Sequence, residues 1–498
     1  MKHSVRSEKP VDRFAEIAAA REESKKQGLI EPEPPQLPQR VLPSSRSDLS
    51  AAFRPRSVID TPARLRLELA RQRKLHARFL RILSPPPEDT RIRLPLTEFD
   101  WRLQTEADLA DFSFTVSGRG DWKRVPIPHY GGPLGRAVAY YRATFEVTAE
   151  MRARGALFIC FEGVDYKAQV FVNGAYLGSH EGMFAPFEFD CTRIVHEGAN
   201  SLLVTVENDA IQLGNDWGPD KDKYEGDKIC AAEGAGYDEP EVGWHVTPPG
   251  MGIHRDVWLE ARRPVFVRDI FVRPMPEESR AEAWVELYSC HSLRQDVKLH
   301  LSVHGQNFHQ TVFTDKEFPP PGQLGPGVNY LRLPFAMRNA RLWDLDTPWL
   351  YQAHVMVLDS EGNPLDMATR QFGMRSFRMD EEHEPKGRLF LNGREIRLRG
   401  ANVSGSIQQC VMRKDWDQLR DDILLAKIAN LNFFRIIQRP VQTAAYDFCD
   451  RLGILTQSDL PLFGVLRRNQ FCEAVRQAEE MERIVRSHPC NVMISYIN

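Results

Sequence analysis

The chain has 498 residues, a hydrophobic content of 42% and a formal net charge of -3 at neutral pH. This length predicts about three domains, and the composition is that of a globular protein with large cores. The small net charge gives no electrostatic reason to expect nucleic acid or an anionic membrane as a partner, and no apolar run approaches the ~20 residues of a membrane-spanning helix.

The N-terminal segment, MKHSVRSEKPVDRFAEIAAAREESKK, has no apolar stretch of the kind that a secretory signal peptide contains. The eight cysteines show neither CxxC pairs nor regular spacing. Without an export signal, such cysteines are typical of reduced and mostly buried thiols. These features predict a cytoplasmic protein.

Residues 1–90 are expected to form an extension ahead of the first domain. Its proline-rich stretch, EPEPPQLPQRVLP, reads as a linker because the fixed φ angles of proline bar regular structure. Thr61 to Leu83 predicts an amphipathic helix with Thr61 as its cap and Pro62 in the first position. Four side chains share one face of this helix: Leu65, Leu69, His76 and Phe79. We favour packing of this helix on the body of the protein over the alternative, binding to a partner.

Residues 91–263 show an all-β pattern. The stretch AYYRATFEV alternates strictly between apolar and other residues, with one face formed by Tyr141, Ala143, Phe145 and Val147. Asn173-Gly174 predicts a type I′ hairpin turn, because both residues tolerate positive φ. Short strands separated by turns are what a β-sandwich requires.

A long polar and glycine-rich insertion spans residues 215–249. Its acidic residues faintly resemble a calcium loop: Asp220, Asp222, Glu225 and Asp227. The EF-hand pattern fails, because Tyr224 stands where an oxygen ligand belongs and the glycine comes one position late. A solvated loop is the favoured interpretation. The alternative is a loop whose Trp217, Trp244 or His245 contributes contacts to a substrate.

Residues 264–380 predict a second β domain. In VKLHLSVHG the apolar residues alternate with polar ones, and the apolar set is Val297, Leu299, Leu301 and Val303. We find no residue pattern here that carries chemistry, so we expect a spacing and packing role.

From residue 381 to 498 the pattern changes to alternating buried strands and helices. RLFLNGREIRLRGAN predicts a hairpin that leads into a strand, and DWDQLRDDILLAKIAN predicts a helix capped by Asp415 with Gln418 as reciprocal capping-box partner. The buried stripe of that helix is expected to be Trp416, Leu419, Ile423 and Ala426. Strand and helix alternation of this kind favours a (β/α)8 barrel, of which about four units are present.

Several ordered phrases resemble glycoside hydrolase family 2, which contains β-galactosidases, β-glucuronidases and β-mannosidases. They are FEGVDYKAQVFVNG, HEGMFAPFEFD and GIHRDVWLE in the first β region, and RLFLNGREIRLRGAN, LAKIANLNFFRIIQRP and YDFCDRLGILTQSDLPLFG further on. The resemblance implies a jelly-roll sugar-binding domain over residues 91–263, an immunoglobulin-like β-sandwich over 264–380 and the first half of a TIM barrel over 381–498. It also implies hydrolysis of terminal β-linked sugars with retained configuration.

A retaining glycosidase needs two carboxyl groups about 5–5.5 Å apart at the carboxyl ends of barrel strands. In the family, the strand after an HP motif ends in Asn-Glu, and that Glu is the acid/base; the nucleophile lies further downstream. Here the corresponding run, HPCNVMISYIN, finishes at Asn498. We therefore expect neither catalytic carboxylate in this sequence, which predicts an inactive fragment. The alternative is a carbohydrate-binding protein without catalysis.

The resemblance implies five substrate-binding candidates. Asn498 matches the Asn that hydrogen-bonds the sugar 2-hydroxyl, and Arg435 matches a pocket arginine that can orient a carboxylate. Asp459 ends a strand where relatives carry an acid, Asn402 ends the first barrel strand, and Gln438 stands where β-galactosidases have a histidine. Their alternatives are structural: a chain terminus for Asn498, an ion pair for Arg435, a turn cap for Asp459 and a loop lock for Asn402.

The glutamine in place of histidine makes galactose a doubtful substrate. Four glutamines near the strand ends could supply amide hydrogen bonds to another sugar: Gln408, Gln409, Gln438 and Gln442. The sequence contains no zinc motif, phosphate loop, dinucleotide fingerprint or Gly-x-Ser-x-Gly elbow. We therefore expect no cofactor and no metal in this part. The resemblance implies a carbohydrate as the partner and a homo-oligomer, since family members are often dimers or tetramers.

Overall fold

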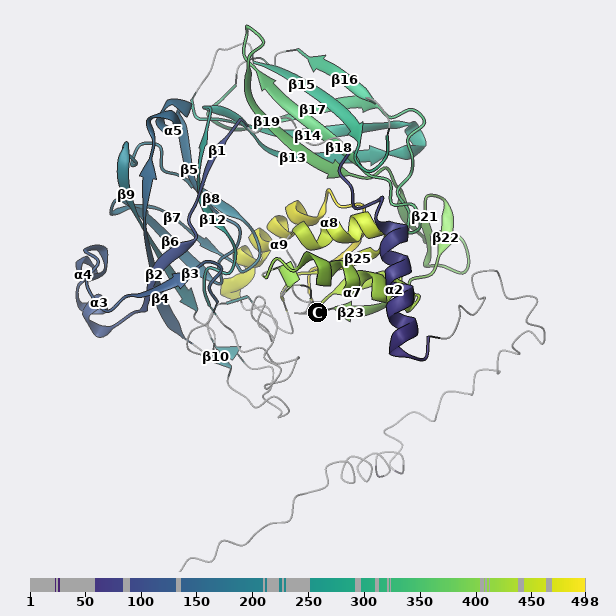
Figure 1. Ribbon diagram of the computed structural model, residues 1–498, viewed down its shortest axis with the longest axis horizontal. Helices are drawn as coiled ribbons and strands as arrows, with labels where there is room; N and C mark the ends of the chain where they lie inside the picture. The colour runs from purple at the N-terminus through teal and green to yellow at the C-terminus, as the bar shows by residue number, and fades with distance from the viewer. Residues whose placement is uncertain are drawn as a thin grey trace, which may run out of the picture. The chain divides into compact units, whose positions relative to one another are not determined.

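The structure is a computed structural model, and the chain divides into two compact units, Met1–Leu65 and Arg66–Asn498. The residues that it describes are 23, 26, 59–83, 90–130, 136–208, 211–212, 224–225, 228–229, 251–291, 297–309, 313–319, 322, 324–403, 407, 410–411, 413–437, 443–462 and 468–497. All of the sheets that the structure describes lie in the second unit (Figure 1).

Helix α2 (Pro62–His76) starts as the sequence predicts, because Thr61 Oγ1 accepts a hydrogen bond from the backbone N–H of Arg64. It ends at His76, seven residues before the predicted end at Leu83. The chain turns there so that the Phe79 ring packs edge-on against Trp349, with 5.1 Å between ring centroids. Tertiary packing therefore ends this helix earlier than its sequence pattern indicates.

The first β region is a sandwich of two antiparallel sheets, with strand orders β3-β2-β4-β9-β6-β7 and β1-β12-β5-β8. The strands are β1 (Ile92–Pro95), β2 (Glu98–Leu103), β3 (Lys123–Pro126), β4 (Ala137–Val147), β5 (Ala156–Phe161), β6 (Lys167–Val172), β7 (Ala175–Glu181), β8 (Phe187–Asp190), β9 (Gly198–Asn208) and β12 (Val257–Arg262). Three short helices accompany them: α3 (Glu106–Ala110), α4 (Ser113–Val116) and α5 (Ala149–Arg154). A two-stranded piece, β10 (Ile211–Gln212) with β11 (Tyr224–Glu225), follows β9.

The predicted inward face of β4 is confirmed, since Tyr141, Ala143, Phe145 and Val147 are all buried in the core between the two sheets. The predicted hairpin is confirmed as well. Asn173 and Gly174 have φ of 49° and 79° and connect Val172 to its partner Ala175. Both residues with positive φ fit the type I′ turn.

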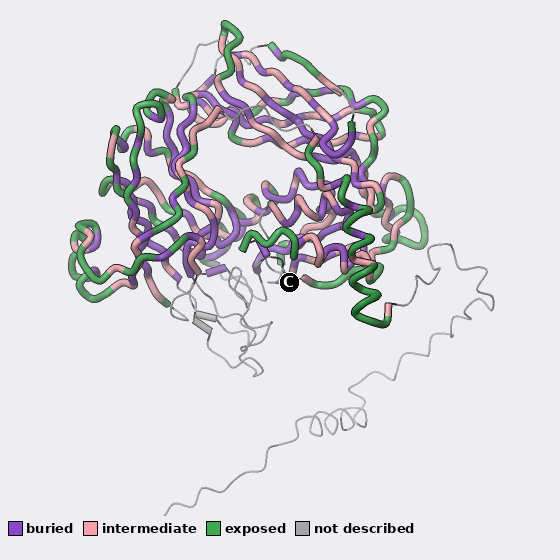
Figure 2. The backbone as a smooth tube through the Cα atoms, viewed as in Figure 1, coloured by how far each residue is buried: buried purple, intermediate pink, exposed green. Residues whose placement is uncertain are grey.

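The second β region consists of the sheets β13-β14-β17 and β16-β15-β18-β19. Its elements are β13 (Val265–Met275), η3 (Pro276–Glu278), β14 (Arg280–Ser289), β15 (Lys298–Gly305), β16 (Thr314–Phe318), β17 (Gly327–Ala336), β18 (Tyr351–Leu358) and β19 (Pro364–Phe372). The predicted apolar set, Val297, Leu299, Leu301 and Val303, is buried between these sheets. Buried positions follow the strands of both β regions in Figure 2.

A small antiparallel sheet of β20 (Phe377–Asp380), β21 (Arg388–Leu391) and β22 (Arg394–Ile396) leads into the α/β region. Asn392 and Gly393 form the predicted hairpin turn between β21 and β22, with φ of 51° and 75°.

The last region is a parallel sheet in the order β23-β24-β25-β26 with helices between its strands. The elements are β23 (Gly400–Val403), α7 (Trp416–Ile428), β24 (Phe433–Ile436), α8 (Thr443–Leu452), β25 (Leu455–Asp459), η4 (Arg468–Gln470), α9 (Phe471–Val485) and β26 (Asn491–Ser495). Consecutive parallel strands joined through helices are the repeating unit of a TIM barrel. The predicted half-barrel is confirmed.

Helix α7 differs from its prediction in two details. Asp415 caps it by accepting the backbone N–H of Gln418, but the Gln418 side chain donates to Asp422 instead of returning to the cap. Leu419, Ile423 and Ala426 are buried as expected, whereas Trp416 is 38% exposed. Trp416 is the first residue of the helix and stacks on Phe448 from outside, so it lies at the rim of the core.

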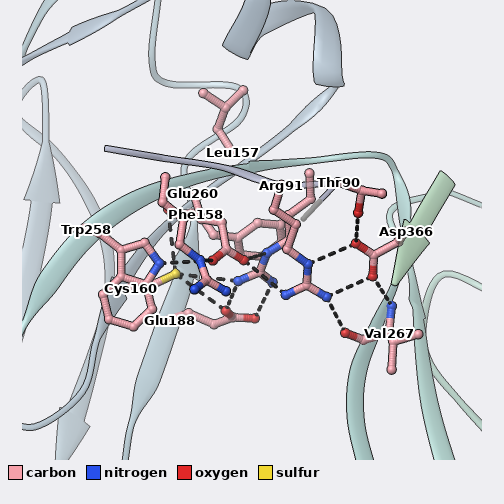
Figure 3. Close-up of polar contacts among 12 residues, drawn as sticks. Thr90, Arg91, Leu157, Phe158, Cys160, Glu188, Trp258, Glu260, Val267 and Asp366 are labelled. Carbon is pink, nitrogen blue, oxygen red and sulfur yellow. Dashed lines mark hydrogen bonds and ion pairs between the residues drawn. The ribbon is translucent and has the colours of Figure 1, made fainter. Parts of the chain in front are cut away.

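A buried ion network joins the two β regions (Figure 3). Arg91 pairs with Glu260 of β12 at 3.1 Å and with Asp366 of β19 at 2.8 Å. Arg262 pairs with the same Glu260 and with Glu188. Burial alone would raise the pKa of Glu260, but the surrounding arginines, with Arg262 first, lower it to about 2. The arginines therefore hold the Glu260 carboxylate ionised at the junction of the two β regions.

Of the seven cysteines that the structure describes, none forms a disulfide and five are buried. This agrees with the predicted reduced thiols. In the described part of the chain, we find no helix that combines the length and the apolar composition needed to cross a bilayer.

Candidate active site

Polar side chains meet where the parallel strands finish. Asn402 of β23 lies opposite Arg435 of β24, and Arg435 lies opposite Gln457 of β25. Residues in register on parallel strands point to the same side of the sheet, so these three share one face. Asp459, two residues after Gln457, belongs to the same face and ends its strand.

The centre of this edge is an ion pair between Arg435 and Asp459. Arg435 Nε donates to Asp459 Oδ2 at 2.8 Å, and Nη2 of the same guanidinium lies 2.6 Å from that oxygen. The other oxygen, Oδ1, accepts from Gln457 Nε2 at 2.8 Å. Asp459 is 1% exposed and the Arg435 side chain 27%. The carboxylate is thus fixed from both sides, while the Arg435 side chain stays partly exposed.

The opposite face of β25 is anchored to its neighbours. Ser458 Oγ lies 2.7 Å from Tyr446 Oη of α8 and donates to Asn491 Oδ1 of β26 at 2.8 Å. All three residues are buried. These bonds fix β25 between helix α8 and strand β26. They therefore fix the position of Asp459 at the end of β25.

The first β sandwich supports the same edge from the side. Arg255 Nη1 donates to the carbonyl of Val411 at 3.1 Å, and Lys414 Nζ lies 2.7 Å from Asp256 Oδ2. Val411 and Lys414 belong to the stretch between β23 and α7. The GIHRD segment that resembles the family therefore contacts the chain beyond the first barrel strand.

A second buried pair lies at the end of the first sandwich. Lys228 Nζ lies 2.6 Å from Asp165 Oδ1, and both side chains are fully buried. Tyr130 Oη donates to Asp165 Oδ2 at 2.9 Å, and the backbone N–H of Ile229 donates to Tyr166 Oη at 2.9 Å. Tyr166 Oη also accepts from Gln477 of α9. These bonds hold residues 228–229 against Asp165 and Tyr166, just before strand β6, and Tyr166 also bonds helix α9.

Two of the five predicted site residues, Arg435 and Asp459, are in direct contact. Asn402 is exposed on the neighbouring strand, in register with Arg435. Gln438 and Asn498 lie outside the described residues. The same holds for further residues singled out in the sequence: Trp217, Asp220, Asp222, Asp227, Trp244, His245, Gln408, Gln409 and Gln442, and of Tyr224 and Glu225 only the backbone is described.

Sequence reasoning did not find Gln457, although its place two residues before Asp459 on one strand puts both on one face. It also did not find the Asp165–Lys228 pair. That pair joins residues 63 positions apart, and no local pattern marks either of them.

One group of residues in the described part of the chain could hold a metal ion: Asp447, Asp450 and His488. It lies at the amino-terminal edge of the sheet, next to the start of β26, and so opposite the Arg435–Asp459 edge. Its atoms already bond one another and their surroundings. His488 Nδ1 is 2.7 Å from Asp450 Oδ2, and the backbone N–H of Cys490 donates to Asp450 Oδ1 at 2.9 Å. We interpret this group as a structural hydrogen-bond network.

The architecture defines a class of protein: two β sandwiches followed by a TIM-barrel sheet whose carboxyl edge carries a cation–carboxylate pair. Three family models match consecutive parts of the chain and together cover more than half of it. They are "Glycosyl hydrolase 2 galactose-binding domain-like" over residues 134–229, "Glycosyl hydrolases family 2" over 265–375 and "Glycosyl hydrolases family 2, TIM barrel domain" over 385–492. The chain belongs to glycosyl hydrolase family 2.

Curated relatives carry the names of two glycosidases. A β-galactosidase of Thermoanaerobacter pseudethanolicus is 27% identical over 375 residues, which cover 72% of this chain and 44% of that protein. A putative β-glucuronidase of Formosa agariphila is 24% identical, over 72% of this chain and 40% of that protein. The chain thus spans less than half of the length of these relatives.

Solved structures show the same fold. A β-glucuronidase of Bacteroides uniformis superposes with a TM-score of 0.65 and 20% identity, over 82% of this chain and 47% of that one. A β-glucuronidase of Ruminococcus gnavus gives a TM-score of 0.62 and 19% identity, over 84% of this chain and 68% of that one.

Proposed function

We propose that this chain is the sugar-recognising part of a retaining β-glycosidase that acts on terminal sugars. Membership of family 2 supports the reaction class, and the names of the relatives support galactosides or glucuronides as substrates. The observation that carries the proposal is the Arg435–Asp459 pair at the carboxyl edge of the parallel sheet, because this edge holds the active site in TIM-barrel enzymes.

We propose a positioning role for Asp459. Both of its carboxylate oxygens already accept hydrogen bonds, from Arg435 and from Gln457. An acid/base must exchange a proton with the substrate, and a nucleophile must present a free oxygen to the anomeric carbon. Asp459 is suited instead to holding the guanidinium of Arg435 toward a sugar hydroxyl or toward another carboxylate.

Arg435 supplies the charge at this edge. Its side chain is 27% exposed and lies in register with the exposed Asn402 of the adjacent strand. A guanidinium and an exposed amide on adjacent strands can hydrogen-bond neighbouring hydroxyls of one pyranose ring. We keep Gln438 and Asn498 as further sugar-binding candidates on the resemblance alone.

The expected consequence is recognition without turnover by the 498-residue chain. Among the strand-end residues that the structure describes, Asp459 is the one carboxylate on this face, so the pair about 5–5.5 Å apart that retention requires is not assembled there. We further propose a cytoplasmic location and keep homo-oligomer formation as a prediction from the family.

The test is a calorimetric titration of the purified chain with the methyl β-glycosides of galactose, glucuronic acid and mannose, together with assays on the aryl β-glycosides. We expect at least one methyl glycoside to bind and Arg435→Met to weaken that binding about tenfold, the usual range for one charged hydrogen-bonding group. Arg378→Met is the matched control, because Arg378 is an exposed arginine on β20. No binding of any of the three sugars would contradict the proposal.

A second function, carbohydrate binding without catalysis, is favoured by the fully bonded state of Asp459. The two differ in one observation. The test applies if the coding sequence continues beyond Asn498. The first function predicts that the longer product hydrolyses an aryl β-glycoside. Binding by the longer product without hydrolysis supports the second function.

A further inference from the structure

The two sides of helix α2 have different surroundings. On one side the helix contacts the body of the protein. Gln72 and His76 are buried there, and Arg73 Nε donates to Asp421 Oδ1 of α7 at 2.8 Å. Leu69 packs against the hydrophobic core of the α/β region from the same side. Figure 1 shows α2 beside α7, so this inner side of the helix is already covered.

The opposite side of the same helix exposes leucines. Leu67 is 74% exposed and Leu75 is 54% exposed, and Ile82, which follows the helix, is 44% exposed. At about 100° per residue, the eight positions from Leu67 to Leu75 correspond to an offset of about 80° around the helix axis. Figure 2 shows this stretch mainly as exposed. Several exposed apolar side chains on one element, in contrast to single ones, indicate a contact surface.

Basic side chains lie next to these leucines. Arg71 comes four residues after Leu67 and Lys74 comes seven, so both lie on the same side of the helix as Leu67. The Arg71 side chain is 73% exposed, and Lys74 is exposed as well. Lys74 precedes the buried His76 by two residues, which places it about 200° away around the helix. The outward side of α2, formed by Leu67, Arg71, Lys74 and Leu75, therefore combines apolar and positively charged groups.

The charge of this stretch differs from that of the rest of the chain. Residues 66–83 contain six basic residues and one acidic residue, Glu68, which gives a net charge of +5. The whole chain has -3, so the remaining residues carry -8. Arg71 pairs with Glu68 at 3.2 Å, whereas Arg66 and Lys74 pair with none of the residues that the structure describes. The small net charge of the chain thus conceals a local positive surface, which an anionic partner would complement.

Three anionic partners can be compared on these observations. Nucleic acids bind basic side chains through phosphates and stack their bases on aromatic rings, but the exposed apolar residues here are aliphatic. An acidic protein segment would neutralise the cations and leave Leu67 and Leu75 in water. A bilayer with anionic lipids matches both features, because its phosphates bind basic side chains and its apolar boundary accepts leucines. The aliphatic stems of Arg71 and Lys74 allow their charged ends to reach the headgroups.

We propose that the outward side of α2 is a docking surface for membranes that contain anionic phospholipids. The helix lies in the plane of the membrane surface, with Leu67 and Leu75 at the boundary of the acyl chains and with Arg71 and Lys74 on lipid phosphates. The inner side keeps its contacts with the α/β region, so docking needs no rearrangement of the fold. Cytoplasmic leaflets carry anionic lipids, which agrees with the cytoplasmic location proposed above. Docking does not depend on sugar recognition at the Arg435–Asp459 edge.

The experiment is co-sedimentation of the whole chain with vesicles of phosphatidylcholine and with vesicles that also contain phosphatidylglycerol. We expect binding to the anionic vesicles only, and release at high salt, because salt screens charges at a surface. Lys74→Glu should weaken this binding about twentyfold, since it removes one cation and adds one anion. Leu67→Ser should weaken it about tenfold through the lost burial of an apolar side chain.

Two matched variants serve as controls. Leu109→Ser removes a leucine of nearly equal exposure, 73%, from α3. Lys123→Glu reverses the charge of an exposed lysine on β3. Neither control should change binding to the anionic vesicles. Leu67→Ser and Lys74→Glu should unfold at the same urea concentration as the parent, because both side chains lie away from the core.

Three results would overturn the proposal. Equal binding to the two kinds of vesicle would remove the role of anionic lipid. Binding that Lys74→Glu abolishes and Leu67→Ser leaves unchanged would indicate an acidic macromolecule as the occupant instead of a bilayer. Self-association of the chain without vesicles, measured by analytical ultracentrifugation and abolished by Leu67→Ser, would show that a second copy covers the outward side of α2.

Discussion

The two edges of the parallel sheet carry the same chemistry, a basic side chain beside a carboxylate, in opposite settings. At the carboxyl edge, Arg435 bonds Asp459 and remains 27% exposed. At the amino edge, the His488–Asp450 pair is closed over, with 5% and 0% exposure of the two side chains. Gln371 of the second sandwich donates to Asp450 Oδ2 at 2.9 Å, and Trp343 Nε1 donates to the Asp450 carbonyl at 2.7 Å.

The proposed function interprets this difference as one between polar groups that stabilise the fold and polar groups that recognise a sugar. At the amino edge every bond joins parts of the fold: helix α8, the start of β26 and the second sandwich. Removing one member of a buried network of this kind costs the protein much of its stability, because the remaining groups stay buried without partners. At the carboxyl edge Asp459 is buried, whereas the Arg435 side chain that bonds it is 27% exposed. Such an arrangement keeps a charge in position for something outside the fold.

Removing the centre of the amino edge should have the largest effect. Asp450→Ala leaves His488 Nδ1 and the Cys490 N–H without their Asp450 partner, and it leaves Gln371 Nε2 with only the longer bond to Asp447. We expect a loss of about 3–5 kcal/mol in the free energy of unfolding, the range for breaking one member of a buried pair. Urea unfolding followed by circular dichroism measures it. Asp417→Ala is the control, since Asp417 is 85% exposed and should cost less than about 1 kcal/mol. Similar losses for the two variants would contradict the comparison.

A second buried network lies outside the parallel sheet. It tests whether burial of an ion pair, rather than its place in that sheet, determines how much stability is lost when the pair is weakened. Asp366→Asn weakens the bonds to Arg91 and to the Val267 N–H in the junction of Figure 3. We expect a loss of about 3 kcal/mol, because Arg91 would stay largely buried without its full counter-charge. Thermal unfolding by calorimetry is the measurement. A change below about 1 kcal/mol would show that this junction does not behave like the amino edge.

The cap of helix α7 offers a smaller perturbation close to the carboxyl edge. Asp415→Ala removes the oxygen that accepts the Gln418 N–H, and we expect a cost of about 1 kcal/mol. Asp415→Asn keeps an acceptor and should retain most of the stability. The measurement is the midpoint of urea unfolding for the two variants. Equal midpoints would mean that the cap does not contribute to the free energy of unfolding.

The smallest effect is a pH dependence at the amino edge. Burial lowers the pKa of His488, but the charge and hydrogen bond of Asp450, with Asp447 nearby, outweigh it and raise the pKa above 6.5. The stabilisation is therefore complete below pH 6.5 and is lost as the pH rises through the raised pKa. The stability difference between the parent and His488→Gln should shrink over that range. A difference that is constant or grows with pH would contradict this assignment.

The sequence predicts local features of this fold well and distant pairings poorly. Alternation along β4 and the Asn173-Gly174 turn depend on neighbouring residues, so their patterns are visible in the chain. Asp459 and Arg435 could be placed because each lies toward the end of a buried strand. The Asp450–His488 and Asp165–Lys228 pairs join residues 38 and 63 positions apart. The exposure of Trp416 depends on which parts of the fold pack over helix α7. None of these can be derived from a local pattern.

The central claim is that the carboxyl edge recognises a sugar, whereas the amino edge only holds the fold together. Asp459→Asn tests it most directly, with the affinity for the methyl β-glycosides and the free energy of unfolding measured on the same sample. We predict an affinity at least about tenfold weaker with a stability loss below about 1 kcal/mol. An unchanged affinity together with a loss as large as that of Asp450→Ala would make this edge another structural network and contradict the account.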